Sequence, residues 1–207
     1  MTNAASRIVT DAGSGDVRHP QLEGRRFSLV PFTPEFYLAA YHLTIANNIS
    51  YRWRFHGSIP SYEQFINTLH ANVLIQFVVV LRPDPKRLAG MVVAYNGNLQ
   101  DGYAYLGAIS DRSFGAGIIE GLFLLMRYVF TVWPVQKLYF ETPSFNVVQF
   151  ESAIRSGLMV EESRLKNHTY YDGRNWDYLT YAMYREQYEA FVSGHSGMFL
   201  DDPVDKQ

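Results

Sequence analysis

The sequence predicts an α/β (α+β) domain whose central sheet is mixed and mostly antiparallel, with helices on both faces. Segments with strand and helix patterns follow one another in the order β-α-α-β-β-β-α-β-α-β-β. The strand patterns in the middle of the chain are separated by short turns, which is typical of an antiparallel meander. A loop with two glycines, at residues 112–117, then leads from a strand into an apolar helix. Together these patterns favour one layered domain over residues 24–191.

The composition favours a chain that folds on its own and excludes several classes of site. Of the 207 residues, 47% are hydrophobic, which is enough for one core. The formal net charge is -2 and no basic block stands out, so neither a nucleic acid nor an anionic membrane is expected as a partner. Cysteine is absent, which excludes disulfides and thiolate chemistry. The 6 histidines follow no ligand spacing, so no metal site is predicted.

The two ends of the chain and its longest apolar runs indicate where in the cell the protein is expected. Residues 1–23 and 192–207 have no regular period and are predicted to be flexible tails. The start of the chain lacks the apolar stretch of a signal peptide. The longest apolar runs, at residues 73–81 and 121–130, are shorter than the roughly 20 residues that span a bilayer. A cytoplasmic protein is therefore expected.

The first strand and helix have clear boundaries in the sequence. Residues 26–32 alternate apolar and polar side chains, as a strand does. Thr33 and Pro34 fit the N-cap and first position of a helix, which is predicted to extend to about Ala46.

A capping box starts the second helix. Ser61 and Gln64 have the spacing at which each side chain reaches the other residue's backbone N–H. This helix is predicted to extend to about Asn72. The loop before it, at residues 47–60, is dense in aromatic and basic side chains.

The remaining elements follow from β-rich runs, helical periodicity and turn residues. Strands are predicted at residues 75–81, 88–95, 103–110 and 137–142, and a final hairpin at residues 159–171 and 177–184. Helices are predicted at residues 117–132 and 146–156, the second closed by Gly157 at the position after its C-cap.

The loop at residues 112–117 reads R-x-x-G-x-G and predicts a seat for a pyrophosphate. Glycines let backbone N–H groups approach a ligand closely, because no Cβ stands in the way. The helix that follows directs its positive N-terminal end to the same place. The alternative is a tight strand-to-helix turn that binds nothing.

At this point the chain resembles the GNAT-fold acyltransferases, and more narrowly the branch of the ribosomal-protein N-terminal acetyltransferases. Residues 26–31 resemble the opening R-L-x-L-R-P of that branch, with valine in place of its second arginine. Residues 112–117 match the acyl-CoA loop Q/R-x-x-G-x-G/A. Asn146, followed by a Gly-Leu pair at residues 157–158, resembles the N…G-F helix signature, and residues 172–177 resemble the closing G-x-x-x-D hairpin.

The resemblance covers residues 22–191 and implies a GNAT-like sheet that binds acetyl-CoA, or another acyl-CoA, as cosubstrate. It places the pantetheine arm along the end of the strand before the loop and the pyrophosphate on the loop amides. The residues implied for the donor are Ala108, Ile109, Ser110, Arg112, Ser113, Phe114, Gly115, Ala116, Gly117 and Ile118, together with Asn146.

The catalytic residues are less clear, because the tyrosine acid that the family often uses is replaced here by Ala153. Glu141, at the end of a strand, is our candidate for the base that deprotonates the amine; the alternative is a solvated strand-end glutamate. Asn146 corresponds to the family asparagine, or else is a helix N-cap. Ser152 is a candidate replacement for the missing acid, or else a small packed or solvated residue.

The resemblance also predicts an acceptor. The loop before the second helix falls where the family forms the acceptor pocket, and its rings and guanidinium groups suit a planar or anionic ligand; the alternative is a lid packed on the core. The residues concerned are Tyr51, Arg52, Trp53, Arg54 and Phe55.

Three functional hypotheses follow. The first is an acyl-CoA-dependent N-acyltransferase that moves acetyl to the primary amine of a small molecule by direct attack in a ternary complex. The second is a protein or peptide N-terminal acetyltransferase, and the third is an inactive GNAT-fold binding or scaffold protein. A homodimer through the aromatic strands of the final hairpin is predicted for each.

Overall fold

The computed structural model describes residues 22–46, 57–114 and 117–195. The acceptor loop predicted at Tyr51, Arg52, Trp53, Arg54 and Phe55 lies outside these residues, as do Gly115 and Ala116 of the glycine loop.

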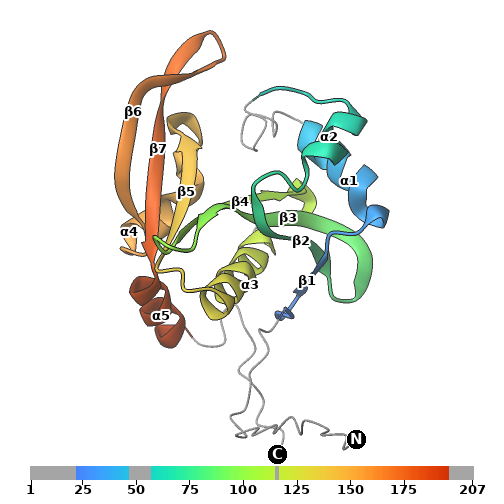
Figure 1. The fold of residues 1–207 in the computed structure, drawn as a ribbon, viewed down its shortest axis with the longest axis horizontal. Helices are drawn as coiled ribbons and strands as arrows, with labels where there is room; N and C mark the ends of the chain where they lie inside the picture. The colour runs from blue at the N-terminus through green and yellow to red at the C-terminus, as the bar shows by residue number, and fades with distance from the viewer. Residues whose placement is uncertain (1–21, 47–56, 115–116, 196–207) are drawn as a thin grey trace, which may run out of the picture.

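The described strands form one 7-stranded sheet in the order β1-β2-β3-β4-β5-β7-β6 (Figure 1). All neighbouring strands are antiparallel except β4 and β5, which are parallel. The strands are β1 (Phe27–Pro31), β2 (Val73–Leu81), β3 (Asp84–Asn98), β4 (Tyr103–Ser110), β5 (Lys137–Pro143), β6 (Val160–Tyr171) and β7 (Arg174–Tyr184).

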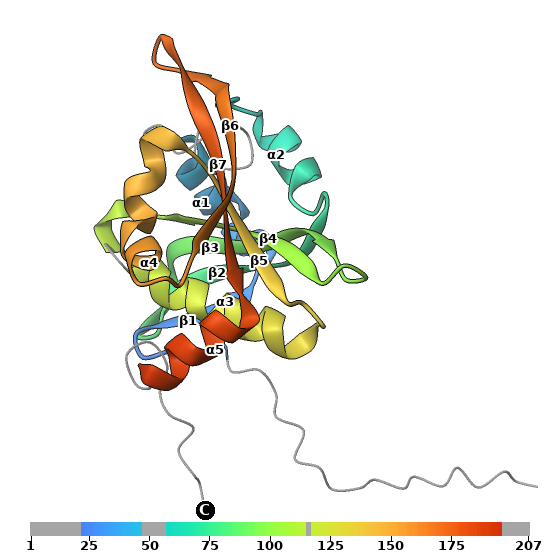
Figure 2. The ribbon, with the colours of Figure 1, turned by 90° about the vertical axis from the view of Figure 1, so that its left-hand side faces the viewer.

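Helices cover both faces of this sheet, as predicted. One face packs on α1 and α2 through Met91, Val93 and Ile109, and the other packs on α3 (Figures 1 and 2). The helices are α1 (Pro34–Ile45), α2 (Tyr62–Thr68), α3 (Gly117–Val132), α4 (Glu151–Arg155) and α5 (Arg185–Gly194), with the 3₁₀ segments η2 (Arg112–Phe114) and η3 (Ser144–Phe150).

Helix α3 holds the main core together. Its fully buried side chains, among them Leu124 and Leu125, lie in one cluster with residues of β1, β5 and β7. Strands alternate their side chains between two faces, so the apolar residues on the α3 face of every central strand meet this one helix. The core therefore spans both sides of the β4–β5 junction.

Most boundaries agree with the prediction within a few residues, although α2 ends at Thr68 and does not reach Asn72. β4 and α3 have the predicted bounds, whereas β3 begins earlier, at Asp84, and includes Pro85. The helix predicted at residues 146–156 is a 3₁₀ segment followed by the short α4. Its end is as expected, with Gly157 at a φ of +74°.

The termini of the domain extend beyond the predicted limits. Glu23 forms an isolated bridge with Ser28, within the segment assigned to the N-terminal tail. Helix α5 continues to Gly194, so residues 192–194 belong to a helix and not to the predicted C-terminal tail. The burial of Tyr188 against the main core explains this helix, which the polar sequence after β7 did not reveal.

Two contacts fix β1 against the start of α3. The Glu120 carboxylate accepts hydrogen bonds from the backbone N–H groups of Arg26 and Phe27, at 2.9 and 3.2 Å. A Cβ added at Gly117 would lie 2.4 Å from the Phe27 ring. Gly117 is therefore required for close packing here, in addition to any role in a phosphate seat.

Candidate active site

Strands β4 and β5 pair over a short distance and then diverge. Their ladder joins Tyr103, Ala104 and Tyr105 to Lys137, Leu138 and Tyr139. β4 then continues to Ser110 and β5 to Pro143, and Figure 1 shows the two strands running apart. Over the described residues, the edge of β4 that faces β5 has no ladder after Tyr105.

Beyond Tyr105, some backbone N–H and C=O groups of β4 point toward the side on which β5 diverges. The N–H of Asp111 donates to the carbonyl of Ala89 on β3, at 2.9 Å. In an antiparallel pair, hydrogen-bonded and non-hydrogen-bonded positions alternate. Ile109 therefore faces β3, while the N–H and C=O groups of Ala108 and Ser110 face the β5 side. An extended ligand could pair with these two residues as an added strand.

The glycine loop lies directly after this edge. Arg112 and Ser113 are exposed in η2, and Phe114 is half-buried with its ring against Phe27. The N–H of Ser113 donates to the Asp111 carboxylate at 2.8 Å.

The carbonyl of Asp111 accepts from the N–H of Phe114, at 3.1 Å. Two of the amides predicted for a phosphate seat thus already have acceptors within the loop. A phosphate seat would therefore use the amides of Gly117 and Ile118 among the described residues. These lie in the first turn of α3, where N–H groups have no acceptor within the helix.

Glu141 lies on the diverging part of β5, opposite Thr180 of β7. Burial raises the pKa of the Glu141 carboxyl above its usual value, and the positive charge of a protonated His168 opposes this rise. A carboxylate with a raised pKa is a stronger base, so this environment suits proton removal from an amine. The predicted strand-end glutamate is thus half-buried rather than fully solvated.

Two tyrosines lie within electrostatic reach of Glu141. Burial raises the pKa of Tyr178, and the Glu141 carboxylate raises it further. The same two causes, in the same order, raise the pKa of Tyr105. Both phenols therefore stay neutral near pH 7 and can donate an O–H to a neighbouring acceptor.

A tyrosine platform extends from Glu141 along the same face of the sheet. It consists of Tyr95, Tyr103, Tyr105 and Tyr139. The ring centroids of Tyr105 and Tyr139 are 5.0 Å apart, and those of Tyr95 and Tyr105 are 5.8 Å apart. The platform lies on the α1 and α2 side of the sheet, because Tyr95 shares its face with Met91 and Val93. Such rings can support a cationic or planar ligand.

The structure bears on the alternatives given for Asn146 and Ser152, and their catalytic roles remain predictions. Asn146 is not an N-cap: it lies inside η3, where its side-chain amide donates to the hydroxyl of buried Thr142 at 3.2 Å. Ser152 is exposed on α4, and the adjacent Ala153 packs against the main core.

Several residues of this site were not singled out in the sequence. The alternation of side chains along their strands would have been enough to predict Tyr105 and Tyr178 on the same face as Glu141. His168 had no such signal, because its orientation depends on an irregularity of β6. The structure brings His168 to Tyr178, with ring centroids 5.8 Å apart.

Comparison with known proteins identifies the fold. No family model matches the sequence, and no curated protein matches it. Among solved structures, a spermidine N-acetyltransferase from Vibrio cholerae in complex with CoA and spermine aligns with a TM-score of 0.66 and 21% identity, over 79% of this chain and 98% of that one. A GNAT-family acetyltransferase from Bacillus anthracis aligns with a TM-score of 0.65 and 17% identity, over 80% and 98%.

A third structure, the spermidine/spermine N-acetyltransferase SpeG from Vibrio cholerae with manganese ions, has a TM-score of 0.63 and 22% identity, over 80% and 96% of the two chains. In the part of the chain that the structure describes, no helix has the length and apolarity to cross a membrane, and no group of His, Asp and Glu could hold a metal. These alignments leave the ribosomal-protein branch a prediction. The described chain has the fold of the GNAT N-acetyltransferases.

Proposed function

We propose that this chain is an acyl-CoA-dependent N-acyltransferase that transfers acetyl to the primary amine of a small molecule. The observation that carries the proposal is the position of Glu141. Its half-buried carboxylate, with a raised pKa, lies on β5 where that strand leaves β4. The fold shared with acetyltransferases, one of them bound to CoA and spermine, supports the same reaction.

The donor would lie along the free edge of β4. Ala108 and Ser110 offer backbone groups to the amides of the pantetheine arm, and Gly117 and Ile118 offer N–H groups to the pyrophosphate. The thioester would then lie between the diverging strands, within reach of an amine held at Glu141. Bringing the two reactants together in this way supplies a large part of the rate.

The reaction needs one proton removed before attack and one afterwards. An alkylammonium first gives a proton to the Glu141 carboxylate. The free amine then attacks the thioester carbonyl, a C–N bond forms and the C–S bond breaks. The CoA thiolate takes one proton and leaves as a thiol; Ser152 remains a candidate donor for that proton, and the second N–H proton then returns to the serine. The tyrosine platform would hold the rest of the acceptor.

Hydrogen exchange measured by mass spectrometry or NMR tests the donor site residue by residue. We expect saturating acetyl-CoA to slow exchange at the N–H groups of Ala108 and Ser110, which face the divergence. The N–H of Ile109 is the internal control, because it already faces β3. Unchanged exchange at Ala108 and Ser110 would overturn the proposed donor site.

An acceptor screen tests the reaction. Thiol release from acetyl-CoA is followed with spermidine, spermine, simple alkylamines and peptides that begin with alanine or serine. We expect release with a small amine. Release with peptides alone would identify an N-terminal acetyltransferase, and CoA binding without release would identify a GNAT-fold binding protein. The cytoplasmic location and the homodimer remain predictions from the sequence.

A further inference from the structure

Strand β6 contains a large bulge opposite Asp177. Leu165 pairs with Tyr178 and Thr169 pairs with Trp176, so residues 166–168 of β6 oppose a single residue of β7. Asn167, in the middle of the bulge, has a φ of +53°. This left-handed conformation is one that asparagine adopts more readily than most residues.

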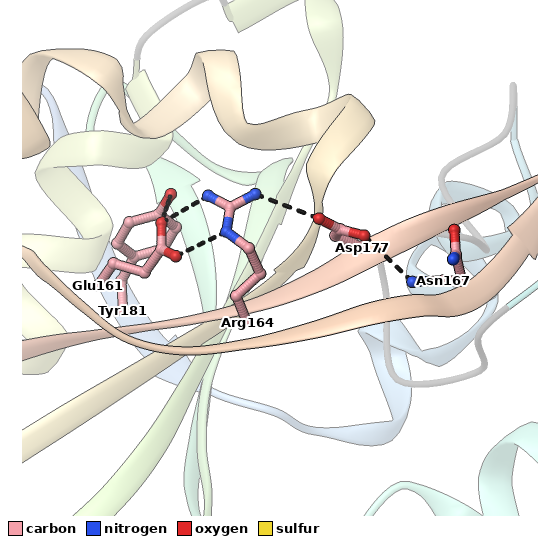
Figure 3. Close-up of polar contacts among 5 residues, drawn as sticks. All are labelled: Glu161, Arg164, Asn167, Asp177 and Tyr181. Atoms are coloured by element: carbon pink, nitrogen blue, oxygen red, sulfur yellow. Dashed lines mark hydrogen bonds and ion pairs between the residues drawn. The ribbon is translucent and has the colours of Figure 1, made fainter.

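The Asp177 side chain holds this bulge (Figure 3). Its Oδ1 accepts a hydrogen bond from the backbone N–H of Asn167, at 3.1 Å. Its Oδ2 accepts from Arg164, at 3.3 Å, and Arg164 also donates to Glu161 at 2.8 Å. The backbone hydrogen bond and Arg164 lower the pKa of Asp177, in that order, so its carboxyl is charged at neutral pH.

The bulge decides which face of the hairpin His168 occupies. In a regular ladder that continued from the Leu165–Tyr178 pair, His168 would lie opposite Asn175. It would then point to the face away from Tyr178, because residues 175 and 178 are an odd number of positions apart. The extra residues bring the His168 ring to 5.8 Å from the Tyr178 ring instead. This is the face that carries Glu141.

The charge of His168 also acts on Glu141. A positive charge on His168 lowers the pKa of Glu141, which burial raises. The Glu141 carboxylate also raises the pKa of the phenols of Tyr105 and Tyr178, after the larger effect of burial. His168 is exposed, whereas Glu141 is half-buried. A proton that leaves Glu141 through His168 would therefore reach water directly.

We propose that His168 is the proton outlet of Glu141 and that Asp177, through the bulge, is the residue that positions it. This inference rests on the proposed acyltransfer reaction. Glu141 takes one proton from the alkylammonium and must lose it before the next turnover. His168 accepts that proton on a ring nitrogen and releases it to solvent. The net reaction of ammonium and thioester then gives amide, thiol and one proton, and no other reactant is needed.

The coupling is tested by NMR titration of the Glu141 side-chain carboxyl in protein labelled with carbon-13 at glutamate. We expect the pKa of Glu141 to be higher in His168→Gln than in the wild type, because the attraction of the imidazolium is lost. Equal pKa values of Glu141 in the two proteins would overturn the proposal. This measurement needs neither donor nor acceptor.

The positioning role is tested with two variants that change the charge of Asp177 equally. Asp177→Asn keeps an oxygen that can accept the Asn167 N–H, whereas Asp177→Ala does not. We expect the Ala variant to behave like His168→Gln, with a Glu141 pKa above that of the Asn variant. The same pKa in the Ala and Asn variants would show that the hydrogen bond to Asn167 does not position His168.

Kinetics with the best amine of the acceptor screen test the outlet itself. We expect His168→Ala to lower kcat about 10-fold, with the KM for acetyl-CoA unchanged, and added imidazole to restore part of the rate. A kcat that is unaffected, or not rescued by imidazole, would count against the outlet. If acetyl-CoA did not slow hydrogen exchange on β4, while the pKa of Glu141 still depended on His168, the result would instead refute the proposed function alone.

Discussion

At the scale of single residues, burial of Glu141 destabilises the charged carboxylate, which is the form that the proposed reaction needs. We expect Glu141→Gln to lower kcat/KM for the amine by roughly 100-fold or more, because the general base is lost, while acetyl-CoA binding is kept. In the wild type, the acidic limb of the pH profile of kcat/KM should lie above the usual range of a glutamate, because burial raises the Glu141 pKa. An unchanged rate in the variant would exclude Glu141 as the base.

The same substitution should stabilise the fold near neutral pH. A carboxyl with a raised pKa in the folded state binds more protons there than in the unfolded state. The free energy of unfolding therefore falls as pH rises from the unfolded pKa through the folded one. Glutamine is neutral at every pH, so the variant does not lose this free energy of unfolding as pH rises. We expect a higher Tm for Glu141→Gln at pH 7 and almost no difference at pH 4; the reverse order would contradict the raised pKa.

A second residue-scale prediction concerns Gly117. Its absent Cβ would lie 2.4 Å from the ring of Phe27, so Gly117→Ala should lower the free energy of unfolding by about 1–3 kcal/mol. Chemical denaturation measures the loss. The double variant with Phe27→Leu is the control, and we expect the two substitutions to be strongly non-additive. Additive losses would mean that the contact with Phe27 is not the cause.

At the scale of elements, the two helix starts near the N-terminus should differ in sensitivity. The Ser61 hydroxyl caps α2, since it accepts from the N–H of Gln64 at 3.2 Å. The Thr33 hydroxyl donates instead to the Glu35 side chain at 2.9 Å and does not cap α1. We expect Ser61→Ala to cost about 1 kcal/mol and Thr33→Ala less than about 0.5 kcal/mol, by chemical denaturation. Equal costs would show that cap geometry does not govern these helices.

At the scale of the whole molecule, α3 joins the two parts of the sheet that diverge at β4 and β5. Leu124 is fully buried in the cluster that spans both parts. We expect Leu124→Ala to lower the free energy of unfolding by about 2–5 kcal/mol, in one cooperative transition. Leu165→Ala on the exposed hairpin is the control, with a change within about 0.5 kcal/mol. Two separate transitions would mean that the parts unfold independently.

Local signals in the sequence predicted most of this fold. The capping box at Ser61, the helix that begins at Gly117 and the positive φ of Gly157 depend on short-range chemistry, and each was recognised from neighbouring residues. The role of Asn146 as an N-cap was wrong, because η3 begins at Ser144, after Pro143, and Asn146 therefore lies inside it, with its amide bonded to Thr142. Helix α5 was missed because its stability comes from the packing of Tyr188 against distant residues of the main core, which no local pattern indicates.

The sequence by itself determined the order of the elements from β1 to β7, the mixed sheet with helices on both faces, and Glu141 as a carboxylate at the end of a central strand. These follow from periodicity and turn chemistry, which act over a few residues. Only the tertiary structure decided that Glu141 is half-buried beside Tyr178 and that His168 shares its face. That arrangement depends on strand pairing between distant segments and on a bulge held by Asp177, and such non-local contacts leave no periodic trace in the sequence.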